Sequence, residues 1–219
     1  FVQNDDNFSA LGSGPCRALA GKEEIFKDIG YEDKFFSTVV VLEVDQTPPQ
    51  EILDKIVTDC NISEKNLTVI LTPTRSLCGT TQVVGRVLEV GLHKVHELGF
   101  PIDKVIDGFG SAPLPPPAPD FLIGMGRTND AILYGGLVHL YVDTPNDDAE
   151  ELAKRLPSST SKDYGKPFAD IFKEYKYDFY QIDKMLFSPA KVIVSSLKTG
   201  KSYTSGDIDL SLMDNSFNK

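Results

Sequence analysis

The sequence predicts an α/β fold built in layers of sheet and helix, and four consecutive segments carry this prediction. Ser37 to Val44 and Leu67 to Thr72 are short runs rich in β-branched residues, which is typical of buried strands. Pro48 to Cys60 lies between them and has apolar residues at helical spacing, and Gln82 to Leu98 follows with the same periodicity. This order of strands and helices is that of layered α/β folds.

Length and composition set wide limits on the class of protein. A chain of 219 residues with 41% hydrophobic residues can form one large domain or two small ones. Its formal charge of −10 argues against a nucleic acid as partner. No segment approaches the roughly 18 consecutive apolar residues of a membrane span, so we expect a soluble protein without a membrane partner.

The cysteines and the amino end indicate the compartment. The three cysteines are odd in number and form no C-x-x-C pair, which argues against a disulfide framework and against a cysteine-based zinc site. A reducing cytoplasm fits this pattern best.

Phe1 to Phe8 lacks an initiator methionine and has neither the basic start nor the apolar run of a signal peptide. We therefore expect a chain that is truncated at its amino end.

The segment Gln82 to Leu98 is predicted to form one helix with a buried face and a polar face. Five apolar residues share the buried face: Val84, Leu88, Leu92, Val95 and Leu98. Five polar residues share the other: Gln82, Arg86, Glu89, His93 and His96. Arg86 and Glu89 are neighbours at i, i+3, so they form either one surface ion pair or part of a functional site. Gly85 and Gly91 each cost such a helix about 1 kcal/mol, which suggests close packing or a ligand.

Two further segments are candidate binding sites. Gly12, Ser13, Gly14 and Arg17 lie where a turn leads into a short helix between Leu11 and Ala20, and such a start either holds an anion or is a plain capping turn. Arg127, Thr128, Asn129 and Asp130 place a cation, a hydroxyl, an amide and a carboxylate side by side. Asn129 or Asp130 could equally cap a helix.

The second half of the chain adds further elements and a proline-rich segment. Ala112 to Asp120 contains five prolines, which exclude regular structure and indicate either a stiff linker or a rigid wall of a cleft. We expect either a domain boundary there, with residues 1–111 forming one α/β domain that carries the Arg86 and Glu89 helix and residues 112–219 a second α/β portion, or one interwoven unit. We also expect one helix and four strands: helix Asp147 to Leu156 and strands Val105 to Phe109, Leu137 to Val142, Ala190 to Leu197 and Ser202 to Thr204.

Four segments taken in series closely resemble the methenyltetrahydromethanopterin cyclohydrolase family. They are GSGPCRAL at Gly12 to Leu19, GRVLEVGLHK at Gly85 to Lys94, GMGRTNDAILYGG at Gly124 to Gly136 and LPSSTSKDYGKPF at Leu156 to Phe168. The resemblance covers essentially the whole chain. It implies a two-domain α/β (α+β) architecture with the active-site cleft between the domains, here without its amino-terminal part.

The resemblance also implies an activity and roles for single residues. It implies reversible hydrolysis of a cationic cyclic methenyl pterin, with Glu89 as general base and Arg86 beside it, and with no metal or other cofactor. The resemblance also implies that the anionic tail of the substrate is bound by cationic side chains, for which the candidates are Arg17, Arg75, Lys94 and Arg127. We expect the substrate to contact nine residues: Gly12, Ser13, Gly14, Arg17, Gln82, Arg127, Thr128, Asn129 and Asp130. The resemblance further implies a homo-oligomer, with a trimer expected.

Two other functions remain alternatives. A metal-dependent hydrolase could use His93, His96 and Glu89 as ligands, although the spacing is not that of an H-E-x-x-H motif. A non-catalytic pterin-binding or assembly protein is the second alternative, and the presence of both Arg86 and Glu89 counts against it. We expect residues 1–219 alone to expose apolar sheet surface and to be poorly soluble and weakly active.

Overall fold

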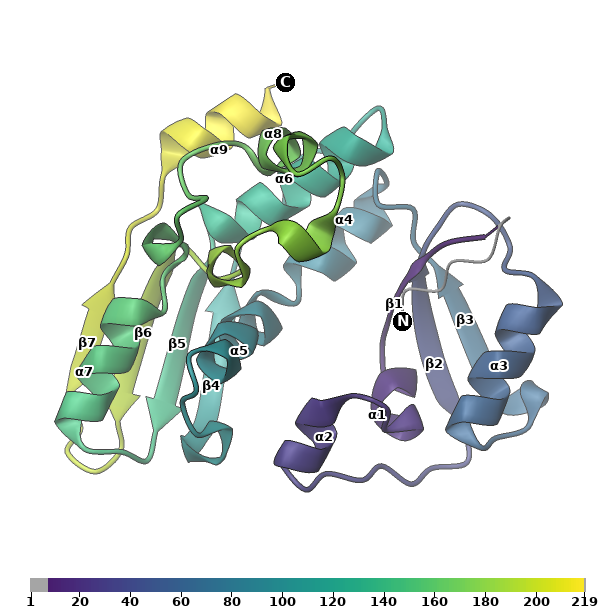
Figure 1. Ribbon diagram of the computed structural model, residues 1–219, viewed down its shortest axis with the longest axis horizontal. Coiled ribbons are helices and arrows are strands. Elements are labelled where there is room, and N and C mark those ends of the chain that lie inside the picture. The colour runs from purple at the N-terminus through teal and green to yellow at the C-terminus, as the bar shows by residue number, and fades with distance from the viewer. Residues whose placement is uncertain (1–7, 219) are drawn as a thin grey trace. The chain divides into compact units, whose positions relative to one another are not determined.

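The computed structural model describes residues 8–218, and the chain divides into two compact units (Figure 1). The first unit runs to Thr74 and the second starts at Arg75. The boundary expected between residues 111 and 112 therefore lies inside the second unit, and the helix that carries Arg86 and Glu89 belongs to this unit too. The reason is that strand β4 (Val105–Ser111) pairs along its length with strand β5, so the proline-rich segment connects two parts of one unit.

The first unit is a three-stranded sheet with helices, and it contains both strands and the helix predicted there. Strand β2 (Thr38–Glu43) lies in the middle, antiparallel to β1 (Leu11–Ser13) and parallel to β3 (Leu67–Leu71). Helix α3 (Gln50–Cys60) makes the crossover between β2 and β3. The shorter elements are α1 (Cys16–Ala20), α2 (Glu24–Asp28) and the 3-10 turn η1 (Glu64–Asn66).

Strand alternation places the core of the first unit on one face of its sheet. Val40 and Leu42 of β2 are buried, and they form one cluster with Ile52 and Ile56 of α3. Burying each such side chain contributes about 1.5–3 kcal/mol. On the opposite face Ile70 of β3 remains 42% exposed. The amphipathic pattern of α3 thus identifies which sheet face the helix covers.

The second unit is built on a four-stranded sheet in the order β4-β5-β6-β7. Strand β5 (Leu137–Val142) is antiparallel to β4 and parallel to β6 (Lys191–Ser196), and β7 (Ser202–Ser205) is antiparallel to β6. All four strands were predicted. The α-helices are α4 (Leu77–Val84), α5 (Val87–Glu97), α6 (Phe121–Leu133), α7 (Asn146–Arg155), α8 (Phe168–Glu174) and α9 (Leu210–Phe217). The 3-10 turns are η2 (Ile102–Lys104), η3 (Ser158–Thr160), η4 (Phe179–Gln181) and η5 (Lys184–Leu186).

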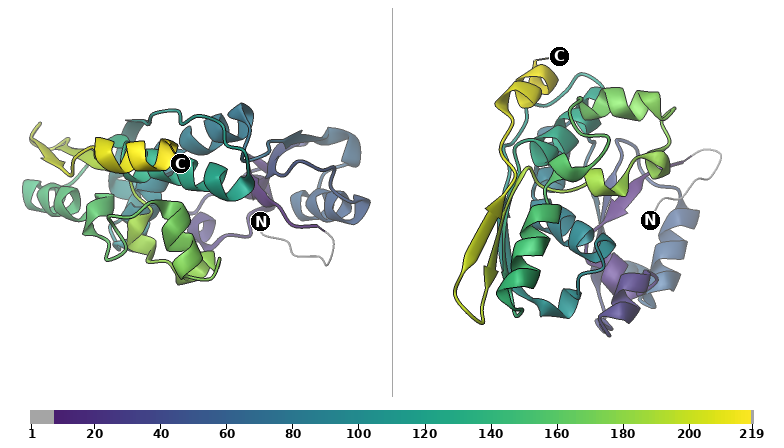
Figure 2. Two further views of the ribbon diagram at one scale, coloured as in Figure 1. Left: turned by 90° about the horizontal axis from the view of Figure 1, so that it is seen from above. Right: turned by 60° about the vertical axis from the view of Figure 1, so that its left-hand side comes forward.

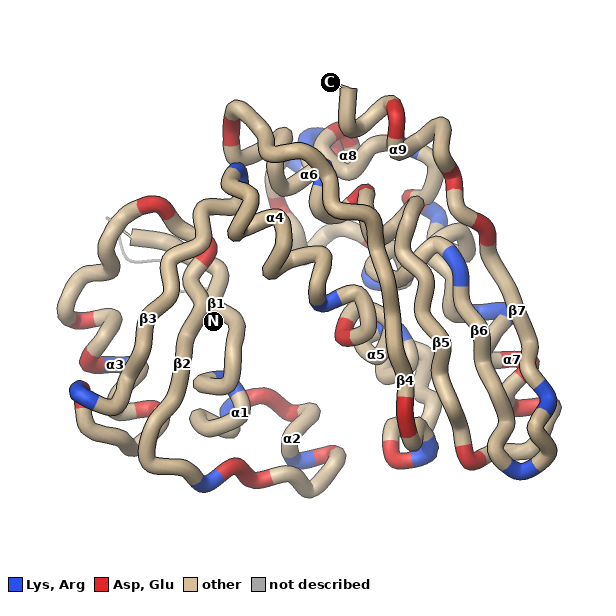
Figure 3. Tube along the Cα trace, turned by 180° about the vertical axis from the view of Figure 1, so that it is seen from behind, with Lys and Arg blue, Asp and Glu red and all other residues tan. Residues whose placement is uncertain are grey.

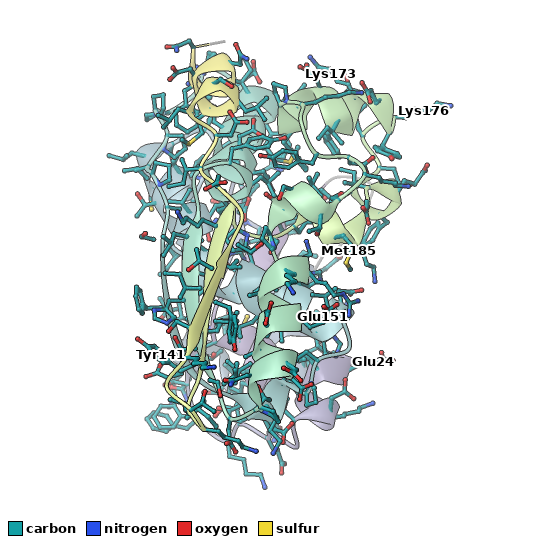
Figure 4. All side chains as sticks on the ribbon, turned by 90° about the vertical axis from the view of Figure 1, so that its left-hand side faces the viewer. Glu24, Tyr141, Glu151, Lys173, Lys176 and Met185 are labelled. Carbon is teal, nitrogen blue, oxygen red and sulfur yellow. The ribbon has the colours of Figure 1, made fainter. Side chains whose placement is uncertain are left out.

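Helices α5 and α7 cover one face of this sheet, and both lie on the same side of it in the right-hand view of Figure 2. Val138 and Leu140 of β5 are fully buried against them. The other face carries Phe109, His139 and Tyr141, whose rings follow one another at centroid distances of 5.3 and 4.3 Å. Figure 4 shows Tyr141 and the α7 residue Glu151 on opposite sides of the sheet. Seen from behind, β5 carries no charged residue (Figure 3).

A second helical layer completes this unit at one end of the sheet. Helix α6 contacts α4, α8 and α9, and its last residue Leu133 and the following Tyr134 form a buried cluster with Phe168, Ile171 and Met213. No helix within residues 8–218 combines the length and the apolar character that crossing a membrane requires.

Candidate functional site

The segment predicted as one helix from Gln82 to Leu98 consists of the end of α4 and the whole of α5. Helix α4 begins at Leu77, before the predicted start at Gln82, because the Ser76 side chain accepts a hydrogen bond from the Gly79 amide at 3.0 Å and caps the first turn. The helix then breaks after Gly85, because Arg86 adopts φ −90° and ψ 15°, outside the helical region. The prediction of a continuous helix is wrong at this point.

Arg86 and Glu89 nevertheless lie side by side, as the spacing predicted. Arg86 Nε is 3.8 Å from Glu89 Oε2, and the two side chains are 33% and 56% exposed. Exposed pairs of this kind contribute about 0–1 kcal/mol, so stability is a weak reason for the pair. Within the described part of the chain, the buried Arg86 Nε has no hydrogen-bond partner. The pair therefore presents a carboxylate to solvent with a guanidinium beside it.

The inner face of α5 packs on the sheet. Most of the apolar residues that the helical periodicity assigned to the buried face lie there. Val95 is fully buried, and Leu88, Leu92 and Leu98 pack against the same cluster. Gly91 lies against Val138, where an added Cβ would come within 3.4 Å of that side chain. The close approach predicted at Gly91 is therefore present, but a Cβ there would make only an ordinary van der Waals contact, so packing does not require glycine at this position.

Lys94 does not have the position expected of a residue that contacts a substrate anion. It is fully buried on the inner side of α5, where Nζ donates hydrogen bonds to Pro157 O at 2.6 Å and Thr160 Oγ1 at 2.8 Å. Burial lowers the pKa of the Lys94 ammonium from 10.5 to about 8, and Asp183 opposes this shift. Through these hydrogen bonds Lys94 links α5 to the turn η3 and the residue before it, which is a structural role.

We expect the wild-type protein to gain stability relative to Lys94→Met as the pH rises from about 8 to 10.5. The folded state holds the Lys94 proton less tightly than the unfolded chain, so the unfolded state binds more protons in this window and stability rises with pH. The difference in unfolding free energy should change by about 3 kcal/mol, measured by denaturant titration at several pH values. Lys55→Met, at an exposed position, is the control and should show no such slope. A pH-independent difference for Lys94→Met would contradict the shifted pKa.

Arg127, Thr128, Asn129 and Asp130 all lie inside helix α6. Asp120 caps this helix, accepting a hydrogen bond from the Ile123 amide at 2.9 Å, so the alternative that Asn129 or Asp130 is a cap is wrong. Thr128 Oγ1 and Asn129 Nδ2 both donate to Met125 O, at 3.0 and 2.9 Å. The helix thus uses one donor of each side chain internally.

Arg127 and Asp130 hold neighbouring segments against α6. Arg127 is 8% exposed, and its Nη1 donates to Pro116 O at 3.2 Å and Pro117 O at 2.7 Å. Asp130 is fully buried, and its Oδ1 accepts from the Phe168 amide at 2.8 Å at the start of α8. The proline-rich segment is therefore fixed within one unit and is not a linker between domains.

The remaining predicted contacts belong to the first unit. Gly14 has φ +97°, and an added Cβ would come within 3.0 Å of Val39 O, so glycine is needed at this turn. Ser13 ends β1 and is buried. Arg17 Nε and Nη2 donate to the two carboxylate oxygens of Glu23 at 2.7 and 2.6 Å, which lowers the pKa of Glu23. The Arg17 charge is thus matched within its own unit.

Two features of the second unit bear on alternative sites. A cavity of about 430 Å³, lined among others by Phe100, Thr144 and Arg155, contains none of the predicted site residues. His93 Nε2 is 3.7 Å from Glu97 Oε1, and burial lowers the pKa of His93. Across residues 8–218 no three His, Cys, Asp or Glu side chains form a group that could hold a metal. The proposed His93, His96 and Glu89 ligand set is therefore not supported.

Comparison with known proteins decides the family. The family model described as "Cyclohydrolase (MCH)" matches residues 2–217. The chain belongs to this family. The resemblance found in the four sequence segments is thereby confirmed.

Individual MCH relatives match over nearly the whole chain. A methenyltetrahydromethanopterin cyclohydrolase of Methylobacillus flagellatus is 58% identical over 97% of this chain and 65% of its own length. Proteins with the same name from Methylosinus trichosporium and Methanothermobacter marburgensis are 52% and 46% identical, over 97% and 96% of this chain and 82% and 67% of their own lengths. The chain thus spans about 65% of the length of relatives such as the first.

Proposed function

We propose that the protein reversibly hydrolyses 5,10-methenyltetrahydromethanopterin to the 5-formyl compound. The observation that carries this proposal is the solvent-facing Arg86 and Glu89 pair, 3.8 Å apart, in a member of the MCH family. Three relatives that are 46–58% identical carry the name of this activity. An exposed ion pair contributes only about 0–1 kcal/mol, so a gain in stability does not explain why the pair is present.

Glu89 acts as general base in this proposal. The methenyl carbon bridges two nitrogens in a cationic amidinium, so it is already electrophilic. Glu89 accepts one proton from water as the water oxygen bonds to this carbon, which gives a neutral carbinol. The bond from the carbon to N10 then breaks, N10 takes the proton from Glu89, and the hydroxyl proton leaves to solvent as the formyl group forms. A positioned general base typically contributes about 10²- to 10⁴-fold.

Arg86 acts through Glu89. Its guanidinium lies beside the carboxylate and restricts the directions in which the carboxylate points. The carboxylate also attracts the cationic substrate, but that attraction weakens once water adds and the positive charge is lost. Positioning of the water therefore contributes more to catalysis than attraction of the substrate does.

Further contacts, assembly and location complete the proposal. The substrate contacts Gln82 beside the pair, and Thr128 and Asn129 of α6 in the same unit are further proposed contacts. Arg127 and Asp130 act through the segments they hold, since both are buried. The protein works as a homo-oligomer, a trimer by resemblance, in the cytoplasm and with the pterin as its small-molecule partner.

The direct test is hydrolysis of the methenyl substrate by the purified full-length protein. We expect the absorbance of the conjugated amidinium to fall in the presence of the protein and a formyl product to appear by mass spectrometry. Binding of the substrate without turnover would instead support a non-catalytic pterin-binding protein and would overturn the proposal.

Activity should not depend on a metal ion, because the positive charge of the substrate itself activates the carbon. Dialysis of the full-length protein against a strong chelator should leave kcat and KM unchanged, as measured by the same absorbance assay. A loss of activity that added zinc or iron restores would contradict this expectation and would return His93 and His96 to consideration as ligands.

A further inference from the structure

The first turn of α5 begins at Val87, between Arg86 and Glu89. The chain leaves the helical region at Arg86, so α4 ends before the pair, and the Arg86 side chain makes no capping hydrogen bond at the start of α5. Val87 precedes Glu89 by two residues, which places their side chains on opposite sides of the helix. A shift of Val87 against the sheet therefore moves both members of the pair.

The methyl groups of Val87 occupy a recess formed by Gly110 of β4 and by Gly136, the residue before β5. Val87 is 4% exposed and belongs to the buried cluster of this unit. A Cβ added at Gly110 would come within 2.8 Å of Val87 Cγ1, and one at Gly136 within 3.1 Å of Val87 Cγ2. Both distances are shorter than the roughly 3.5–4.0 Å at which carbon atoms pack. The absence of two side chains thus lets Val87 approach the sheet.

Gly110 has no reason in its own backbone conformation to be a glycine. It lies inside strand β4 and does not have a positive φ. Glycine within a strand weakens the strand and often marks a place where another segment approaches closely. At Gly136 the closest contact of an added Cβ is Ile132 O at 2.5 Å, a carbonyl of the preceding helix, which requires glycine locally. At Gly110 the closest contact is Val87 itself.

We propose that Gly110 is a positioning residue for the candidate pair: it seats Val87 against the sheet and thereby fixes the direction in which α5 presents Glu89, with Arg86 beside it. This inference rests on the proposed function. Alanine at position 110 requires Val87 to move outward by roughly 1 Å, because the 2.8 Å contact must lengthen to a normal packing distance. Misplacement of a catalytic group on the order of 1 Å can lower the rate about 10²-fold.

The test is a double-mutant cycle at positions 87 and 110 in the full-length protein. Gly110→Ala should lower kcat at least about tenfold per folded molecule, measured well below the melting temperature. KM should change less than about threefold, because the proposed contacts Gln82, Thr128 and Asn129 lie outside α5. Val87→Ala removes the methyl group that the new Cβ meets, so both changes together should restore kcat to within about threefold of wild type.

Two further variants separate positioning from stability. Leu152→Ala removes buried volume from the same cluster on α7, which packs on β6 and β7. It should lower the melting temperature at least as much as Gly110→Ala does and leave kcat within about twofold of wild type. Val87→Ala alone leaves the recess partly empty and should lower kcat at least about threefold. The gain on adding Gly110→Ala to it is then measurable even where the single Gly110→Ala variant does not fold.

Three results with the variants would overturn the inference. The first is a kcat of folded Gly110→Ala within about twofold of wild type. The second is a folded double variant no more active than Val87→Ala. The third is an equal loss of kcat in Leu152→Ala and Gly110→Ala, which would indicate general loosening of the unit. Absence of turnover by the wild-type protein would instead contradict the proposed function, and the inference with it, whatever the variants do.

Discussion

Glu89→Gln in the full-length protein should lower kcat by about 10²- to 10⁴-fold while the fold remains intact. The amide has the shape of the carboxylate but cannot accept a proton from water. Because Glu89 is 56% exposed and its contact with Arg86 is 3.8 Å long, little stability depends on its charge. The measurement is steady-state hydrolysis of the methenyl substrate, together with thermal unfolding.

The matched control for this variant is Glu97→Gln on the same helix. Glu97 contacts the exposed Lys184 at 3.1 Å and is placed in no catalytic role, so this change should leave kcat within about twofold. Retention of more than about a tenth of wild-type kcat in Glu89→Gln would remove Glu89 from the role of general base.

Asp130→Ala should lower the free energy of unfolding by about 3 kcal/mol. Its fully buried carboxylate accepts the Phe168 amide at 2.8 Å, and truncation leaves that amide buried without its acceptor. Asp130→Asn retains an acceptor oxygen and should therefore cost clearly less. Denaturant unfolding of both variants measures the difference.

Kinetics distinguish this structural role from direct contact with the substrate. Asp148→Ala, at an exposed position on α7, is the control and should cost less than about 1 kcal/mol. If both Asp130 variants unfolded like the wild type but showed a raised KM, the carboxylate would face the substrate, and the role of holding α8 against α6 would be wrong.

Local sequence patterns determined most of the secondary structure and the candidate pair. The β-branched runs at Ser37 to Val44 and Leu67 to Thr72 became β2 and β3, and the alternation of β2 selected its buried face. The i, i+3 spacing placed Arg86 beside Glu89 even though the helix breaks at Arg86 itself, because the break lies at the first residue of the pair. The four family segments identified the MCH family, since they follow one another in order along the whole chain.

Only the tertiary structure decided which polar residues are buried and which unit holds each segment. Lys94 and Asp130 lie among polar residues in the sequence, yet both are buried, where Lys94 Nζ donates to Pro157 O and Asp130 Oδ1 accepts from the Phe168 amide. Pairing of β4 with β5 placed the proline-rich segment inside one unit. The physical reason is that periodicity reports which face of an element is apolar, whereas the hydrogen-bond partner of a buried charge comes from residues far away in the chain.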